Sequence, residues 1–237
     1  MIEAVSAVLP AGTHVSGVIA APDGAPAPGV VVLHEITGID GGIKDACLRL
    51  ADNGYVAFAP DLYSRRFRPI CIASTLLSLA RNRPAPVEDL VGCLAWLRAR
   101  PEVSGPSAVL GFCMGGGYAL ALAVQADLAV GAINYGGVPL TADELEGICP
   151  IVASYGTDDK RFVDDGRRLE QLLRQLGVPH DVRIYEGATH SFMNDRRGGL
   201  AGRLFGVRYD LDAAEDAWRR TLAFFDRYLV AEAPLLP

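Results

Sequence analysis

Three kinds of side chain that together perform nucleophilic catalysis occur in this chain, and the first is a cysteine. Cys113 lies in Gly111-Phe112-Cys113-Met114-Gly115, between a buried strand predicted at 108–110 and a helix predicted across 118–125. This setting is typical of a nucleophile elbow, where glycines permit a tight turn and the helix N-terminus favours a thiolate. The backbone N–H of Met114 is then placed to donate to an oxyanion. The alternative is a buried structural cysteine beside a tight turn.

A catalytic thiol needs a base, and the base needs a group that orients it. His190 follows a strand predicted at 181–185, so it is the histidine best placed to reach the carboxyl edge of a sheet. Either Asp158 or Asp159, after a strand predicted at 151–155, is a candidate for the orienting acid. The resulting order of nucleophile, acid and histidine is that of the α/β-hydrolase fold.

The remaining histidines have less specific surroundings. His14 and His180 are expected to face solvent at the edges of elements, and His34 ends a predicted strand as either a core or a rim residue. His34-Glu35-Ile36-Thr37-Gly38 is not the H-E-x-x-H pattern of a zinc hydrolase. We therefore expect no metal and no other cofactor.

The elements that must position these groups alternate between strand and helix from residue 30 to the end. Short apolar runs predict strands at 30–33, 55–59, 108–110, 129–134, 151–155 and 181–185. Helical spacing of apolar residues predicts helices at 43–53, 87–97, 118–125, 169–176 and 214–225. This alternation predicts one α/β domain over residues 1–237, with a mainly parallel central sheet covered by helices on both faces.

Composition excludes several classes of protein. Half of the 237 residues are hydrophobic, enough for a large core, and the net charge of −6 disfavours binding to nucleic acid. The five cysteines are odd in number and form no C-x-x-C pair, so neither a zinc site nor a disulfide framework is predicted. Neither a signal peptide nor an apolar run long enough for a bilayer is visible, so we expect a cytoplasmic protein without a membrane partner.

Several segments in their order along the chain resemble the dienelactone hydrolase family. They are Val32–Gly38, Ala59–Tyr63, Gly111–Gly116, Gly156–Asp159 and Gly187–Phe192. The resemblance implies an α/β-hydrolase fold and hydrolysis of small esters or lactones, of the carboxymethylenebutenolidase type. It also implies a Cys113–His190–Asp159 triad that works through an acyl-enzyme, and so selects Asp159 over Asp158.

The resemblance further implies roles for the loop after the first predicted strand. Glu35 would contact the resting thiol, and the backbone N–H groups of Ile36 and Met114 would form the oxyanion hole. Independently, a carboxylate at the end of a buried strand is costly unless it is solvated, paired or hydrogen-bonded. The alternative for Glu35 is a salt bridge at the rim of the sheet, for example with Lys44.

A second group of residues is expected to bind the substrate. The candidates are Arg81, Tyr135, Ser191 and Asn194. Asn194 occupies the place where characterised dienelactone hydrolases carry a substrate-binding arginine. Arg81 belongs to a stretch at 62–87 with five arginines and no acidic residue, which favours an anionic ester or lactone. The alternative for that stretch is a solvated helical flap.

Other functions remain as competing hypotheses. A general carboxylesterase or a thioesterase would differ only in the shape of the pocket. A non-hydrolytic thiol redox sensor would use the same low-pKa thiol, and a ligand-binding module would not need the pairing of Asp159 with His190. The sequence does not choose between a monomer and a homodimer.

Overall fold

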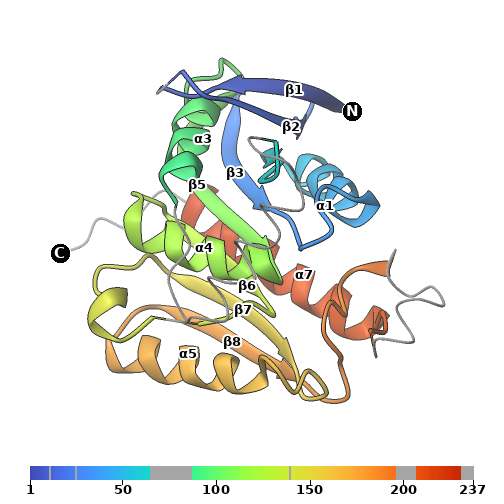
Figure 1. Cartoon of the computed structure of the whole chain (residues 1–237), viewed down its shortest axis with the longest axis vertical. Coiled ribbons are helices and arrows are strands. Elements are labelled where there is room, and N and C mark those ends of the chain that lie inside the picture. Colours follow the sequence, from blue (N-terminus) through green and yellow to red (C-terminus); the bar gives the residue numbers. More distant parts are fainter. Residues whose placement is uncertain (11, 25, 65–86, 139, 196–206, 231–237) are drawn as a thin grey trace.

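The computed structural model describes residues 1–10, 12–24, 26–64, 87–138, 140–195 and 207–230. Within these residues, eight strands form one sheet in the order β1-β2-β4-β3-β5-β6-β7-β8 (Figure 1). The strands are β1 Ile2–Val8, β2 His14–Ala20, β3 Ala27–Leu33, β4 Val56–Pro60, β5 Val103–Phe112, β6 Val130–Asn134, β7 Ile151–Gly156 and β8 His180–Tyr185. All neighbours from β4 to β8 pair in parallel, which confirms the predicted α/β class.

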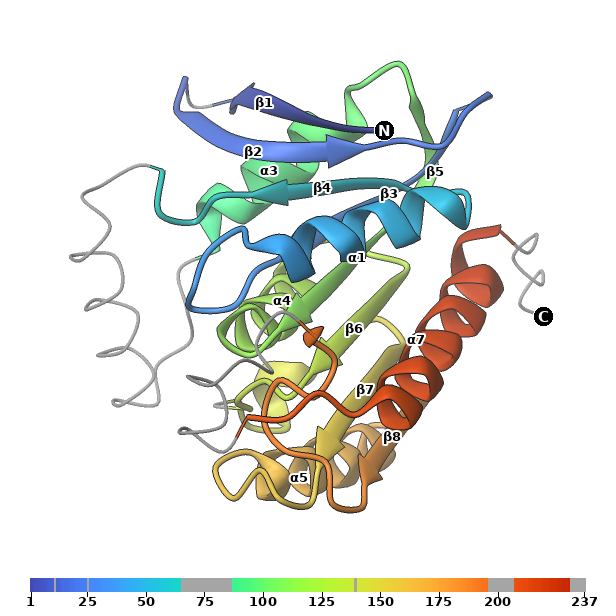
Figure 2. The ribbon, with the colours of Figure 1, turned by 90° about the vertical axis from the view of Figure 1, so that its right-hand side faces the viewer.

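Helices cover both faces of this sheet. They are α1 Gly41–Asp52, α3 Glu88–Arg98, α4 Met114–Gln125, α5 Val163–Gln175 and α7 Leu211–Phe225, with short 3-10 and π turns at Asp143–Leu145 and Asp226–Val230. In Figure 2, α1 and α7 lie on one face and α3, α4 and α5 on the other. Since both faces are covered, Val30 to Leu33 of β3 are fully buried and form a continuous apolar run.

The core therefore has two halves, one on each side of the sheet. On the α3–α4–α5 side, leucines of the three helices pack on the strands, among them Leu94, Leu120 and Leu169. On the α1–α7 side, Leu50 and Trp218 are members of the second cluster. This arrangement leaves the carboxyl ends of the parallel strands, with the loops that follow them, as the edge where functional side chains gather.

The N-terminal strands fall outside the predicted set, which began at residue 30. β1 pairs with β2, and β2 with β4, in antiparallel register, so this hairpin extends the sheet beyond its parallel part. His14 is exposed at the start of β2, as expected. His180, also expected to face solvent, is partly buried as the first residue of β8, and its Nδ1 lies 2.7 Å from the carbonyl oxygen of Val178.

The structure corrects the predicted start of the helix after the cysteine. α4 begins at Met114, directly after Cys113, whereas the sequence predicted a helix only from residue 118. Glycines at positions 115–117 have low helix propensity, and this hid the first turn from a pattern-based prediction. The start at Met114 places the helix N-terminus next to the thiol, as a nucleophile elbow requires.

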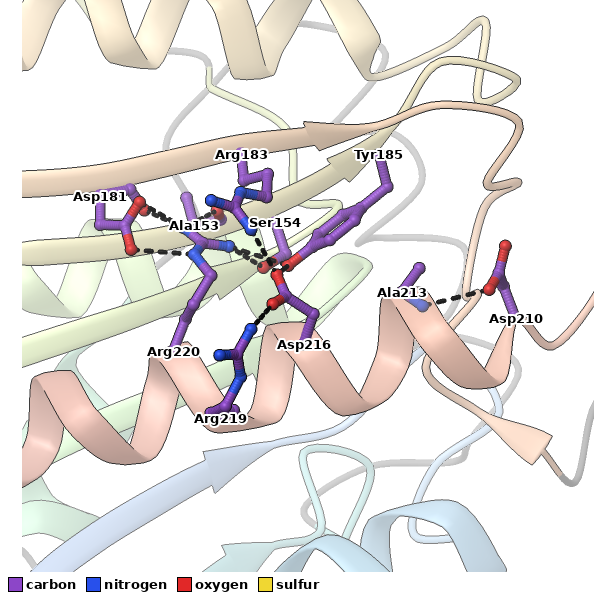
Figure 3. A network of polar contacts seen from close by, with 10 residues as sticks. All are labelled: Ala153, Ser154, Asp181, Arg183, Tyr185, Asp210, Ala213, Asp216, Arg219 and Arg220. Carbon is purple, nitrogen blue, oxygen red and sulfur yellow. Dashed lines mark hydrogen bonds and ion pairs between the residues drawn. The ribbon is translucent and has the colours of Figure 1, made fainter.

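A buried arginine ties α7 to the strands beside it (Figure 3). Arg220 is 8 % exposed and donates hydrogen bonds to the side chains of Asp181, Ser154 and Tyr185. It also donates to the carbonyl oxygens of Ala153, at 3.3 Å, and Asp181, at 2.6 Å. We call these five residues the Arg220 cluster. They join the last helix to β7 and β8 through a charge that is fully provided with acceptors.

No helix among the described residues has both the length and the apolar character needed to cross a membrane.

Candidate active site

The chain makes a strained turn between β5 and α4, and Cys113 is at its centre. Its φ of 55° lies in the left-handed region, which costs a residue other than glycine about 1–3 kcal/mol. Space is equally restricted on either side. A Cβ on Gly111 would lie 2.1 Å from the carbonyl oxygen of Gly115, and a Cβ on Gly115 would lie 2.1 Å from that of Leu33. The glycines of the motif are therefore required by close backbone packing, as the nucleophile-elbow interpretation predicted.

The structure brings Cys113, His190 and Asp159 together from three loops at the carboxyl edge of the sheet. His190 Nε2 lies 3.0 Å from Cys113 Sγ, and His190 Nδ1 lies 2.6 Å from Asp159 Oδ2. Cys113 follows β5, Asp159 follows β7 and His190 follows β8. Asp158, the alternative acid, has a half-exposed side chain that lies 3.8 Å from Arg208 and makes no contact of this kind.

The surroundings of His190 favour its protonated form. Burial alone lowers the pKa of His190, but hydrogen bonds with Asp159 and Cys113 outweigh that effect and raise the pKa to about 10. Two aromatic rings hold the imidazole in place: Tyr135 meets it edge-on at 5.2 Å, and Phe162 lies at the same distance in a tilted arrangement. A protonated imidazole beside Cys113 stabilises a thiolate there.

The two residues expected to supply oxyanion N–H groups, Met114 and Ile36, follow the neighbouring strands β5 and β3. Met114 is the first residue of α4, so its N–H has no partner within the helix. Ile36 follows β3, which pairs in parallel with β5 and places Leu33 opposite Gly111. Tyr63 contacts both residues: its hydroxyl donates to the carbonyl oxygen of Ile36 at 2.9 Å and lies 3.5 Å from Met114 Sδ.

Glu35 is buried shortly after the end of β3, at 1 % exposure. Its Oε2 accepts a hydrogen bond from the side-chain amide of Asn194 at 3.2 Å. A contact of Glu35 with the resting thiol stays a prediction. Lys44, the example of a salt-bridge partner for Glu35, is exposed on α1.

A cavity of about 150 Å³ lies beside Glu35 and Asn194, between α1 and α7. Its walls include three residues predicted to act at the site: Glu35, Tyr135 and Asn194. Phe112 and Trp218 add aromatic surface to it. Asn194 is buried and lies within 3.5 Å of Asp40 Oδ2 as well as of Glu35, so its amide joins two carboxylates. The Asn194 amide is neutral, whereas the arginine that the family resemblance leads us to expect here would present a positive charge.

Of the two other residues predicted to bind substrate, Ser191 lies within the described part of the chain and Arg81 does not. Ser191 is fully buried directly after His190, with a φ of 57°, and its hydroxyl has no hydrogen-bond partner among the described residues. Arg81 lies outside the described residues, as do the other arginines of the 62–87 stretch.

Sequence reasoning assigned no role to three residues that contact the site. Phe162 packs on His190, Tyr63 contacts Ile36 and Met114, and His34 lies fully buried at the end of β3. Tyr63 belongs to the Ala59–Tyr63 segment of the family resemblance, but nothing in that segment shows which backbone groups its hydroxyl reaches.

Cys113 is the most accessible of the four cysteines that the structure describes. Cys47, Cys93 and Cys149 are buried, and burial raises the pKa of each of these thiols to about 12. These three thiols therefore stay protonated at neutral pH and are poor nucleophiles, whereas His190 favours a thiolate at Cys113.

Comparison with known proteins places these observations in a family. Residues 15–229 match the model of the dienelactone hydrolase family. "Protein usf" of Aquifex pyrophilus is 30% identical over 229 residues, which cover 92% of this chain and 95% of that protein. A carboxymethylenebutenolidase of Rhodococcus opacus is 30% identical over 217 residues, covering 84% and 81% of the two chains.

A solved structure shows the same similarity in three dimensions. A dienelactone hydrolase-like promiscuous phosphotriesterase from metagenomic libraries superimposes with a TM-score of 0.81 at 26% identity. The superposition covers 96% of this chain and 99% of that one. The α/β-hydrolase fold predicted from the sequence is thereby confirmed.

Proposed function

Because this chain belongs to the dienelactone hydrolase family, we propose that it is a cysteine-dependent hydrolase of small esters or lactones. The observation that carries the proposal is the 3.0 Å approach of His190 Nε2 to Cys113 Sγ at a nucleophile elbow, with Asp159 behind the imidazole. The carboxymethylenebutenolidase among its relatives makes a lactone or enol ester a reasonable first substrate.

In the proposed mechanism, the thiol proton resides on His190 before the substrate reacts. His190 accepts that proton at Nε2, and Asp159 holds the proton at Nδ1, so the imidazolium faces the Cys113 thiolate. The raised pKa of His190 supports this assignment, since the protonated ring persists at neutral pH. The N-terminus of α4 stabilises the thiolate further.

The thiolate then attacks the carbonyl carbon of the ester and forms a tetrahedral intermediate. Its oxyanion would accept hydrogen bonds from the N–H groups of Ile36 and Met114. As the intermediate collapses, the C–O bond to the leaving group breaks, and the proton on His190 Nε2 passes to the leaving oxygen. The acyl group is left on Cys113 as a thioester.

Water completes the reaction. Neutral His190 takes a proton from a water molecule, which attacks the thioester carbon through the same oxyanion site. Collapse of the second intermediate breaks the C–S bond and releases a carboxylic acid, and the departing Cys113 thiolate again faces the imidazolium of His190. We propose that Tyr135, Ser191 and Asn194 shape the space beside this path, and that Arg81 selects anionic substrates. The expected cytoplasmic location would keep Cys113 reduced.

A redox sensor is the main competitor from another class. It would use the same thiol, but a reversible sensor is often paired with a resolving cysteine. Cys47, Cys93 and Cys149 are buried with raised pKa values, which argues against each of them in that role. The contact of His190 with Asp159 is a further feature that hydrolysis requires and sensing does not.

The test compares the wild type with Cys113→Ala on a neutral p-nitrophenyl ester and on a carboxylated unsaturated lactone. Cys149→Ala, which removes a buried thiol elsewhere, is the matched control. We expect turnover that disappears in Cys113→Ala and persists in Cys149→Ala. A preference for the carboxylated lactone would support an anionic substrate and a role for the arginine-rich stretch. Turnover that survives Cys113→Ala would contradict the mechanism, and peroxide titration of the thiol would then test the sensor.

A further inference from the structure

His34, at the end of β3, makes contacts that the proposed mechanism does not yet use. The side chain is fully buried, and both ring nitrogens are engaged. Nε2 accepts a hydrogen bond from the backbone N–H of Leu62 at 3.0 Å. The ring proton must therefore lie on Nδ1, which is 2.7 Å from the carbonyl oxygen of Glu35 and donates to it.

The Glu35 carbonyl that receives this bond belongs to the same peptide unit as the N–H of Ile36. A trans peptide is planar, with its C=O and N–H pointing in opposite directions, so fixing one fixes the other. The N–H of Gly38 also donates to the Glu35 carbonyl, at 2.9 Å, and closes a turn over residues 35–38. The hydrogen bond of this turn uses the N–H of Gly38, and the N–H of Ile36 takes no part in it.

Tyr63 holds the next peptide unit in the same way. Its hydroxyl donates to the carbonyl oxygen of Ile36 at 2.9 Å, and the hydroxyl oxygen of Tyr63 lies 3.5 Å from Met114 Sδ. The Tyr63 ring is 5.1 Å from that of His34, and the residue is only 5 % exposed. The two buried side chains thus brace both peptide units around Ile36, and Tyr63 also touches the residue that carries the second N–H.

We propose that His34 and Tyr63 are positioning residues that aim the N–H of Ile36 at the oxyanion and hold it in register with the N–H of Met114. The inference rests on the proposed function, because an oxyanion forms only if the protein attacks a carbonyl group. Neither residue touches substrate. Each acts on the reaction through the orientation of one donor, which is worth most when it is fixed before the charge develops.

A purely structural role for the two residues makes a different prediction, and a second reaction of the same thiol separates the two. Alkylation of Cys113 by iodoacetamide displaces iodide from a saturated carbon, so no oxyanion is formed. The alkylation rate therefore reports the thiolate and the integrity of the elbow. Ester hydrolysis depends on these and also on the oxyanion donors.

Two variants of His34 form a matched pair. In His34→Asn the side-chain amide replaces Nδ1 and can still donate to the Glu35 carbonyl, whereas in His34→Gln the amide replaces Nε2 and cannot. Each variant loses one of the two hydrogen bonds of the imidazole. We expect kcat to fall about tenfold or more in His34→Gln, with KM and the alkylation rate within about twofold of wild type. His34→Asn should retain most of the wild-type kcat.

Tyr63→Phe removes one hydroxyl and leaves the ring packed on His34. We expect a fall in kcat of about threefold to tenfold, again without a matching fall in the alkylation rate. An unchanged melting temperature in Tyr63→Phe would show that the loss does not come from a loosened core.

The outcomes separate this inference from the function on which it rests. If the wild type hydrolyses esters and His34→Gln retains the wild-type kcat, the inference is overturned and the proposed function stands. A parallel fall of kcat and alkylation rate in His34→Gln, shared by His34→Asn, also overturns it, because the whole elbow would then have moved. Wild type that hydrolyses no ester overturns the proposed function and this inference with it.

Discussion

The catalytic cluster of Cys113, His190 and Asp159 and the Arg220 cluster both place ionisable side chains within the body of the protein. They differ in backbone geometry. Among the described residues, the non-glycine positions with positive φ are Cys113, Tyr135 and Ser191, and all three lie at or beside the catalytic cluster. The Arg220 cluster is built on regular strands and on α7 (Figure 3).

The two clusters also differ in what their polar atoms can still do. Arg220 donates to acceptors on β7 and β8 through all three of its guanidinium nitrogens, so its charge is already neutralised by protein groups. The side chain of His190 stays 21% exposed and shares its proton with a thiol that can react. In the Arg220 cluster, the buried polar groups all have partners and stabilise the fold. In the catalytic cluster, the backbone is strained and one polar group stays accessible, so these side chains can react with a substrate.

The largest expected effect concerns the acid of the catalytic cluster. Asp159→Asn keeps the shape of the side chain but loses the charge that holds the proton on His190 Nδ1. In serine enzymes the equivalent change costs about 10⁴-fold in kcat, and we expect a fall of about 10³-fold or more here. Steady-state ester hydrolysis measures it, and urea unfolding should show little change. A variant with wild-type turnover would remove Asp159 from the mechanism.

The complementary change breaks the Arg220 cluster. Arg220→Met should lower the free energy of unfolding by about 3–5 kcal/mol, because it leaves buried acceptors without their shared donor. Turnover measured well below the melting temperature should stay within about twofold of wild type. Arg219→Met is the control, since Arg219 is exposed on the same helix and its ion pair with Asp216 should contribute less than about 1 kcal/mol. Equal destabilisation by both variants would contradict the distinction between the clusters.

The strain at the elbow can be measured separately from its chemistry. Cys113→Ala and Cys113→Gly both abolish the nucleophile, but only glycine accepts a φ of 55° without strain. We expect Cys113→Gly to unfold with a free energy about 1 kcal/mol higher than that of Cys113→Ala. A glycine variant less stable than the alanine variant would show that the turn is not strained.

The remaining effect is a pH dependence of stability from His190. Its pKa is raised in the folded protein to about 10, from an ordinary value of 6.5, so the folded state binds the proton more tightly than the unfolded state. The stability that this proton contributes is complete below about pH 6.5 and is lost as the pH rises toward 10. We therefore expect the difference in melting temperature between wild type and His190→Asn to shrink over that window. A difference independent of pH would argue against a protonated His190.

The sequence predicted the part of the fold whose apolar pattern is strongest. The buried strands at 30–33 and 151–155 and the helix through Leu169 and Leu173 are uniform in period, and the structure places elements there. The N-terminal hairpin was not predicted, although β2 alternates buried and exposed residues as an antiparallel strand does. The alternation of strands with helices, on which the predicted fold rests, begins only at residue 30.

Predictability of the candidate site follows the same logic. Cys113, Asp159 and His190 each follow a predicted strand, so topology alone places them at one edge of the sheet. The contacts of the Glu35 carboxylate depend on its side-chain rotamer, so the sequence does not reveal its hydrogen bond with Asn194. The bracing by His34 and Tyr63 acts through backbone carbonyls, which carry no signal in the sequence.

The most direct test of the account is to look for the acyl-enzyme itself. Wild-type protein mixed with an activated acyl ester and quenched in acid should carry the acyl group on the peptide that contains Cys113. Wild type in which Cys113 was first alkylated should carry none and should not turn over ester. Turnover by the alkylated protein, or an acyl group on another residue, would contradict the claim that Cys113 is the nucleophile.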